Sequence, residues 1–282
     1  MPAAFTDRWV IDHAHRRHDQ RSQSEDYILV DPSTGLLGVF DAVGGRDQGR
    51  LVSHLAGKTI AAAWQTLPAT ERQGPPSQLE AALQAVIRQA DATIAALEIL
   101  PDDKRPATTV VLGALSWQDT HSHVTLAHVG DSRAYLLRAG QPLQRLTEDH
   151  GYFPFAVRRG YLSREEGIRI EQASCPNELS PFDQTHFARR HQITCAVGWT
   201  DFRRVPTCSL ALVPGDGLLL CTDGLHDNLT DQEIEGILRA SRETSAQRLV
   251  QAAYERSQHT HVRAKQDDIS AVVAWYLASE AG

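Results

Sequence analysis

Aspartates stand where four apolar runs of the sequence stop or begin. Asp41 ends LLGVF, Asp131 ends VTLAHVG and Asp223 ends GLLLCT, while Asp267 and Asp268 directly precede ISAVVAW. Buried strands end at the rim of a sandwich, where such carboxylates are partly desolvated and repel one another unless cations neutralise them. Oxygen ligands without an H-E-x-x-H pattern favour Mg²⁺ or Mn²⁺ over zinc. The pattern predicts a divalent-metal site, although aspartate beside glycine is also a common turn former.

Thiol chemistry is not expected. The four cysteines lie well apart with no C-x-x-C pair, and none is followed by arginine at the C-x₅-R spacing of a cysteine phosphatase. A disulfide framework or a thiolate zinc site is therefore improbable, and Cys221, inside LLLC, is predicted to be a buried small hydrophobe. The H-x-H pairs lie in polar stretches without a cysteine partner, so we interpret them as solvated loop residues rather than zinc ligands: His13/His15, His121/His123 and His259/His261.

Length and charge limit the functional classes. The chain has 282 residues, 41% of them hydrophobic and 22% charged, with a formal net charge of −7. This balance argues against a general nucleic-acid or membrane-surface partner. The first residues lack the apolar core of a secretory signal, and no apolar run approaches the ~18 residues that span a bilayer. We expect one soluble, cytoplasmic domain over residues 1–282.

The elements that would position the aspartates come in blocks. Strands are predicted at 27–31 and 36–41, at 108–117, 123–131 and 132–140, at 209–221 around a turn at 214–217, and at 269–277. Helices are predicted at 47–67, from Ser77 to before Pro101, after the capping box of Ser163 and Glu166, after Thr230 with Glu233, and at 244–257. Because strands and helices do not alternate regularly, an α+β fold is expected, with antiparallel sheets covered by helices on their outer faces.

Six motifs recur in order around these acids. They are RSQSED from Arg21, VFDAVGG around Asp41, GDSRAY around Asp131, TEDH from Thr147, PGDGLLLCTDGL up to Leu225, and DDIS from Asp267. The series resembles the protein phosphatase 2C family of metal-dependent protein phosphatases, in its bacterial single-domain form. The match runs from about residue 20 to residue 275. One motif alone is weak, but six in order are specific.

The resemblance implies a four-layer α-β-β-α sandwich with a dinuclear Mn²⁺ or Mg²⁺ centre at one rim. Asp41 would bridge the ions, the carbonyl of Ala42 would add a ligand, and Asp223 and Asp267 would hold the other ion. The further residues have supporting roles: Arg21 would clasp the substrate phosphate, Asp26 and Glu25 would orient metal-bound waters, and Asp131 would either help bind a third ion or only brace its turn.

Several positions depart from the family pattern. Ala42 replaces a glycine, and Asp268 replaces an asparagine, so that its charge either tightens metal binding or faces solvent. Val43 stands where some members have the histidine that protonates the leaving group, which leaves a metal-bound water, His13 or His15 for that step. The flap, about 150–192, contains an insert at 170–192 that is either a substrate-facing element or a disordered surface loop. Asp149 and His150 are expected to stabilise the start of the flap.

The function that these features predict is hydrolysis of phosphoserine and phosphothreonine on proteins by a water that two metal ions activate. Such a signalling enzyme would act on a phosphorylated protein and oppose a serine/threonine kinase. Two alternatives stay open at this point. A pseudophosphatase would use the same fold as a binding module, and a hydrolase of another phosphoester would share the metal site, because the motifs do not determine the leaving group.

Overall fold

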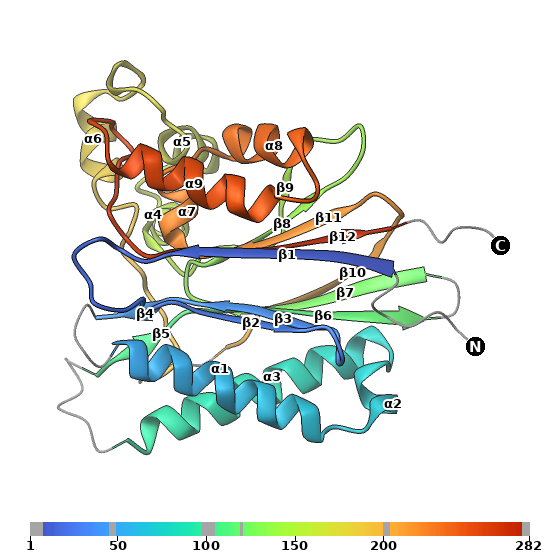
Figure 1. Cartoon of the computed structure of the whole chain (residues 1–282). Coiled ribbons are helices and arrows are strands. Elements are labelled where there is room, and N and C mark those ends of the chain that lie inside the picture. The colour runs from blue at the N-terminus through green and yellow to red at the C-terminus, as the bar shows by residue number, and fades with distance from the viewer. Residues whose placement is uncertain (1–7, 45–48, 98–104, 119–120, 200–203, 278–282) are drawn as a thin grey trace.

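Two five-stranded antiparallel sheets face each other in a computed structural model that describes residues 8–44, 49–97, 105–118, 121–199 and 204–277 (Figure 1). The first sheet has the order β1 (Trp9–Arg16), β12 (Ile269–Tyr276), β11 (Gly217–Cys221), β8 (Arg133–Leu137) and β9 (Gln144–Arg145). The second has the order β10 (Thr207–Leu212), β7 (His121–Val129), β6 (Val110–Gln118), β3 (Leu36–Phe40) and β2 (Tyr27–Asp31). A third, two-stranded sheet pairs β4 (Ala42–Val43), which directly follows Asp41, with β5 (Ala107–Thr108).

Helices cover the outer faces of both sheets (Figure 1). The second sheet is covered by α1 (Gly49–Thr66) and α3 (Pro76–Ala95), which are joined through α2 (Ala69–Arg72). The first sheet is covered by α8 (Asp231–Ala240) and α9 (Ser245–Ser257). The expected four-layer α+β sandwich is therefore confirmed, and the capping boxes at Ser163 and Thr230 are present as predicted.

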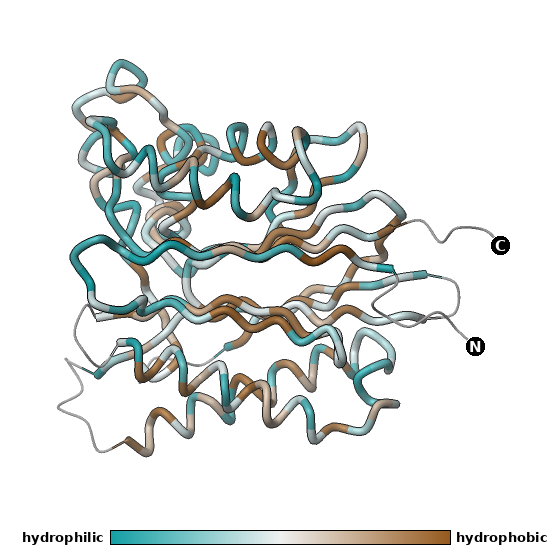
Figure 2. The backbone as a smooth tube through the Cα atoms, in the orientation of Figure 1, coloured by the Kyte–Doolittle hydropathy of each residue, from teal (hydrophilic) through white to brown (hydrophobic). Residues whose placement is uncertain are grey.

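Three apolar layers hold the sandwich together. Trp64 and Phe40 belong to the layer between the helix pair and the second sheet, Leu37 and Leu220 to the layer between the sheets, and Trp275 to the layer under α8 and α9. Strands in the middle of a sandwich are buried on both faces, so their sequences read as continuous apolar runs (Figure 2). Cys221 lies in such a run and is fully buried, as predicted.

The interpretation of two histidine pairs was wrong. His13 and His15 lie in β1, an edge strand that the sequence analysis did not predict and that pairs with β12 along its whole length. His121 and His123 lie in β7. Both segments look polar because exposed strand positions tolerate polar side chains. The third pair does lie outside helices and strands.

The flap is folded, so the interpretation of its insert as a disordered loop was wrong. It contains α4 (Tyr152–Arg158), α5 (Arg164–Glu171), a 3₁₀ turn (Pro176–Glu178) and α6 (Pro181–Phe187). Aromatic and aliphatic side chains form an apolar cluster of its own, including Tyr152, Phe153, Ile170 and Phe187. Across the described residues, no helix is both long and apolar enough to cross a membrane.

Candidate metal centre

Carboxylates gather at the rim where β3, β7, β11 and β12 end or begin. Burial raises the pKa of Asp41 well above its ordinary value, and the charges of Asp223, Asp26 and Asp267 raise it further. Burial and the charge of Asp223 likewise raise the pKa of Asp131 well above its ordinary value. Each carboxylate opposes the ionisation of its neighbours, so these groups lie near enough to one another for their charges to interact.

The main chain holds Asp41 and its neighbours in place. The Asp41 carbonyl accepts hydrogen bonds from the Thr109 N–H at 2.8 Å and from the Thr108 hydroxyl at 2.9 Å. The Asp41 N–H donates to the Thr109 hydroxyl at 3.1 Å. Ala42 continues into β4, where it pairs with Thr108. The main chain at the end of β3 is therefore held in place on both its carbonyl and its N–H side.

Asp26 is buried and bound on one side. Its Oδ2 accepts hydrogen bonds from the hydroxyls of Thr222 at 2.9 Å and Ser270 at 2.7 Å, while Oδ1 has no hydrogen-bond partner among the described residues. Burial raises the pKa of Asp26 well above its ordinary value. The free oxygen suits the predicted task of orienting a water. Thr222 and Ser270 were not predicted to hold Asp26, although both lie inside the motifs that carry Asp223 and Asp267.

Lys265, which was not predicted as a site residue, lies among the carboxylates of the rim. Its ammonium contacts Oδ2 of Asp223, Oδ2 of Asp227 at 2.9 Å and Oδ2 of Asp267 at 3.2 Å. Burial alone would lower the pKa of Lys265, but the three carboxylates hold it well above its ordinary value. Neither Lys265 nor Asp227 was predicted, although Asp227 follows Asp223 by one helical turn and Lys265 is one of three lysines in the chain.

The donor set fits a hard divalent cation. All the side chains concerned offer carboxylate oxygens, and Oδ1 of Asp223 is buried with no hydrogen-bond partner among the described residues. As the described side chains stand, no three of the His, Cys, Asp and Glu groups are at ligand spacing for one ion. The Lys265 ammonium contacts two of the predicted ligands. The assignment of ions to Asp41, Ala42, Asp223 and Asp267, with Asp131 at a third, stays a prediction.

Arg21 reaches the rim but is paired there. Its Nη1 contacts Oδ2 of Asp268 at 2.6 Å and Oδ1 of Asp267 at 3.2 Å, and its Nη2 lies 3.3 Å from Oε2 of Glu25. The side chain is 31% exposed, so part of the guanidinium faces solvent. The structure therefore brings Arg21, Glu25 and the DDIS motif together, and the phosphate-binding role of Arg21 stays a prediction.

Asp268 does not face solvent, which corrects one of its two interpretations. Its side chain is 1% exposed and accepts the backbone N–H of His18 at 2.6 Å and that of Glu25 at 2.7 Å, besides pairing with Arg21. These bonds tie the loop between β1 and β2 to the start of β12. Asp268 thus acts as a positioning residue for the loop that carries Arg21 and Glu25.

Replacing Asp268 with Ala is expected to lower the free energy of unfolding by about 3 kcal/mol, because two backbone N–H donors and the Arg21 guanidinium lose their acceptor. Asp268→Asn keeps an acceptor on one side but turns its NH₂ toward the N–H donors on the other, so it should lose about 2 kcal/mol. Urea unfolding in the presence of a chelator measures both values. Equal losses in the two variants would contradict the assignment of Asp268 as an acceptor.

A second ionic network braces the flap. The Arg133 guanidinium donates to both oxygens of Asp149, at 2.6 Å for the shortest contact, and to Oε1 of Glu171 at 2.6 Å. Glu171 is also bound by Arg145 at 3.0 Å. Arg133 and Asp149 are buried, and Glu171 lies in the flap helix α5. The expectation that Asp149 stabilises the start of the flap is confirmed.

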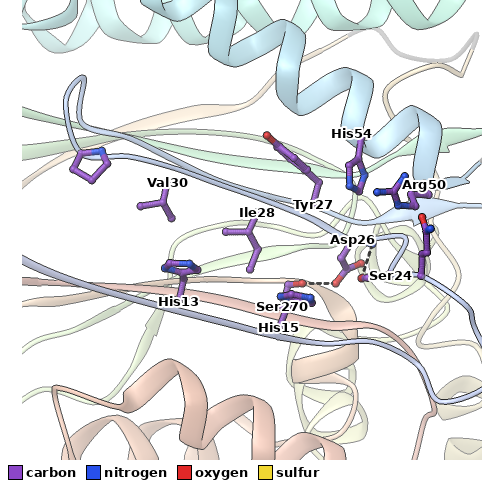
Figure 3. Close-up of a pocket in the computed structure, with 12 residues that line it drawn as sticks. His13, His15, Ser24, Asp26, Tyr27, Ile28, Val30, Arg50, His54 and Ser270 are labelled. Carbon is purple, nitrogen blue, oxygen red and sulfur yellow. Dashed lines mark hydrogen bonds between the residues drawn. The ribbon is translucent and has the colours of Figure 1, made fainter.

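A cleft of about 600 Å³ opens beside Asp26, between β1, β2 and α1. Figure 3 shows His13 and His15 from β1 on one side of it and Arg50 and His54 from α1 on the other, with the hydrogen bond between Ser270 and Asp26 at one end. His13 and His15, the two candidate proton donors, therefore line the same cleft as Asp26.

Comparison with known proteins shows similarity in both parts of the chain. The family model Protein phosphatase 2C matches residues 6–153, and the model Stage II sporulation protein E (SpoIIE) matches residues 182–276. The serine/threonine phosphatase stp of Listeria monocytogenes is 28% identical over 246 residues, which are 87% of this chain and 86% of that protein. The serine/threonine protein phosphatase PstP of Mycobacterium tuberculosis is 30% identical over 253 residues, 89% of this chain and 41% of that protein.

Solved structures show the same fold. The M. tuberculosis serine/threonine phosphatase PstP/Ppp aligns with a TM-score of 0.75 at 26% identity, covering 96% of this chain and 100% of that one. The catalytic domain of PstP in complex with two manganese ions aligns with a TM-score of 0.69, also at 26% identity.

The fold and the site thus define a protein phosphatase of the sandwich type. Because the family model matches more than half of the residues, the chain belongs to the protein phosphatase 2C family, as its six motifs indicate.

Proposed function

We propose that the chain removes phosphate from phosphoserine and phosphothreonine residues of proteins, with two Mn²⁺ or Mg²⁺ ions at the rim. Asp41, the Ala42 carbonyl, Asp223 and Asp267 would hold the ions, and Asp131 would serve a third. Bound ions of this kind lower the pKa of a water and neutralise charge on phosphoryl oxygens. The observation that carries the proposal is the gathering of buried carboxylates at the rim, where Oδ1 of Asp223 has no hydrogen-bond partner among the described residues.

The protein groups divide the remaining tasks. Asp26 orients a water through its free Oδ1, while Thr222 and Ser270 hold the other oxygen still. The planar guanidinium of Arg21 suits phosphate oxygens, and it would release its carboxylate partners Asp267 and Asp268 to bind the substrate phosphate. Val43 cannot protonate the leaving alkoxide. We therefore assign that step to a bound water or to His13 or His15, which line the cleft beside Asp26.

The substrate class rests on the relatives. The named relatives from Listeria and Mycobacterium are serine/threonine phosphatases, and one aligned structure contains two manganese ions. A phosphoprotein substrate presupposes a serine/threonine kinase that makes it, and the chain would oppose that kinase. The pairing of Lys265 and Arg21 with predicted metal ligands is the one observation that favours the alternative, a binding module without activity.

The test compares the chain with its Asp223→Asn variant. A phosphothreonine peptide and an aryl phosphate are offered with and without Mn²⁺, and phosphate release is measured. We expect Mn²⁺-dependent release that falls by about 10²-fold or more in the variant, because a ligand charge is lost where the transition state develops charge. Asp19→Asn, the same change at an exposed loop position, is the matched control and should stay active.

Each other outcome selects an alternative. If neither substrate releases phosphate at millimolar Mn²⁺, the result would favour the alternative in which the chain is a binding module without activity. Release from the aryl phosphate but from no phosphopeptide would favour a hydrolase of another phosphoester.

A further inference from the structure

The backbone of Lys265 is clamped on both sides by one buried side chain. Asn228 accepts the Lys265 N–H through Oδ1 at 3.0 Å and donates from Nδ2 to the Lys265 carbonyl at 2.9 Å. The same Nδ2 donates to the carbonyl of Gly224 at 2.8 Å, in α7 (Asp223–His226), the short helix that begins with Asp223. Because Asn228 is fully buried, Lys265 holds a fixed position relative to Asp223.

Arg263 holds the segment that carries Lys265 at a second point. Its guanidinium is buried and donates to the carbonyls of Glu171 at 2.6 Å and Ala173 at 3.2 Å, and to that of His226 at 2.6 Å. The first two carbonyls belong to the flap and the third to α7. Residues 263–265 are therefore held at two points, and the Lys265 side chain starts from a rigid base.

The ammonium of Lys265 has as many N–H donors as it has carboxylate neighbours. It has three N–H groups, and three carboxylates surround it: Asp223, Asp227 and Asp267. Its side chain is 21% exposed, and those of Asp223 and Asp227 are 10% and 6% exposed, so little water screens these charges.

We propose that Lys265 is a resident cation of the metal centre, and that its ammonium fills one cation position between Asp223, Asp227 and Asp267. A divalent ion that entered this position would meet a like charge at close range or would have to displace the ammonium from its three carboxylates. The chain therefore takes up one divalent ion fewer than the same carboxylates would hold without Lys265, and the ions of the proposed function would bind through Asp41 and through Oδ1 of Asp223, which Lys265 does not contact. The proposal rests on the proposed function insofar as it treats Asp223 and Asp267 as metal ligands.

The test counts Mn²⁺ ions without reference to activity. Full-length wild-type protein and Lys265→Met are equilibrated with Mn²⁺, and bound metal per chain is measured by dialysis with elemental analysis and by calorimetry. We expect the variant to bind one more ion per chain, with an affinity about tenfold or more above any binding of that ion by the wild type. Lys265→Arg, which keeps the charge, should bind as many ions as the wild type. Lys58→Met, at an exposed position of α1, controls for loss of a lysine elsewhere.

Thermal unfolding supplies a second readout. In a chelator the Tm of Lys265→Met should fall, because three carboxylates lose their counter-ion, and Mn²⁺ should raise its Tm more than that of the wild type. If Lys265→Met does not fold without metal, Lys265→Gln, which is neutral but still donates hydrogen bonds, takes its place. An equal number of bound Mn²⁺ ions in wild type and neutral variants, zero included, would overturn the proposal. Phosphate release from the phosphopeptide by either protein tests the proposed function separately.

Discussion

Replacing Asp41 with Asn should abolish most metal-dependent phosphate release while making the metal-free protein more stable. Activity is expected to fall by about 10²-fold or more, because the residue proposed to bridge the two ions loses its charge. Stability is expected to rise by a few degrees in Tm, because the variant removes a carboxylate that Asp223, Asp26 and Asp267 repel. The same substitution is thus expected to lower the rate of phosphate release and to raise the Tm of the metal-free protein.

The pH dependence of that gain has a definite sign. The pKa of Asp41 is raised in the folded chain, so between the unfolded value of 3.8 and the folded value the folded state binds more protons than the unfolded state. The ionised carboxylate therefore destabilises the metal-free protein increasingly as the pH rises through this window, and the full effect persists above it. The stabilisation by Asp41→Asn should be small near pH 4 and largest at neutral pH.

Thermal unfolding in a chelator at several pH values, together with the phosphopeptide assay, measures both effects. Asp19→Asn is again the matched control, since this exposed carboxylate contacts Arg16 and Tyr254. A variant that is inactive and also less stable than the wild type without metal would show that Asp41 is held by favourable contacts. In that case the cluster would not be the strained, cation-requiring site that the raised pKa values indicate.

Replacing Arg133 with Met is expected to lower the free energy of unfolding by about 3–5 kcal/mol. Arg133 is buried, with Asp149 and Glu171 as its ion-pair partners at 2.6 Å. Removing the guanidinium leaves two carboxylates in a region of low dielectric without their main counter-charge. Because Glu171 belongs to the flap, we also expect the flap to become more open to proteases before the sandwich unfolds.

Arg145→Met is the matched control for this prediction. Arg145 pairs with the same Glu171 at 3.0 Å but is 25% exposed, so water screens its charge and the loss should stay near 1 kcal/mol. Urea unfolding of both variants, with limited proteolysis of the flap, measures the difference. Similar losses of unfolding free energy in the two variants would contradict the prediction, because they would show that burial of the Arg133 ion pairs does not make their removal more costly.

Much of the architecture could be predicted because it follows local patterns. Continuous apolar runs such as GLLLC identify strands that are buried on both faces, and the spacing of Leu79, Leu83 and Ile87 identifies α3. Capping boxes mark the starts of α5 and α8 for the same reason, since their hydrogen bonds join residues three positions apart. The strand-end aspartates were brought together as expected, because strand ends meet at a rim.

Long-range contacts account for what the sequence did not reveal. β1 is an edge strand whose identity depends on pairing with β12, more than 250 residues away, and its own pattern is too polar to predict it. Lys265 reaches the rim from a loop whose backbone Asn228 holds, and no spacing rule encodes that contact. Asp268 was placed in the correct motif, but its acceptor role depends on the backbone of His18 and Glu25 at the other end of the chain.

The way Arg263 joins the flap to the sandwich has a consequence for how such a protein can evolve. Its guanidinium bonds main-chain carbonyls of Glu171, Ala173 and His226, and a carbonyl oxygen is the same whichever side chain its residue carries. The joint therefore depends on backbone shape and not on the identity of the residues it binds. Substitutions at outward-facing positions of the flap helices therefore leave the acceptors of this joint in place.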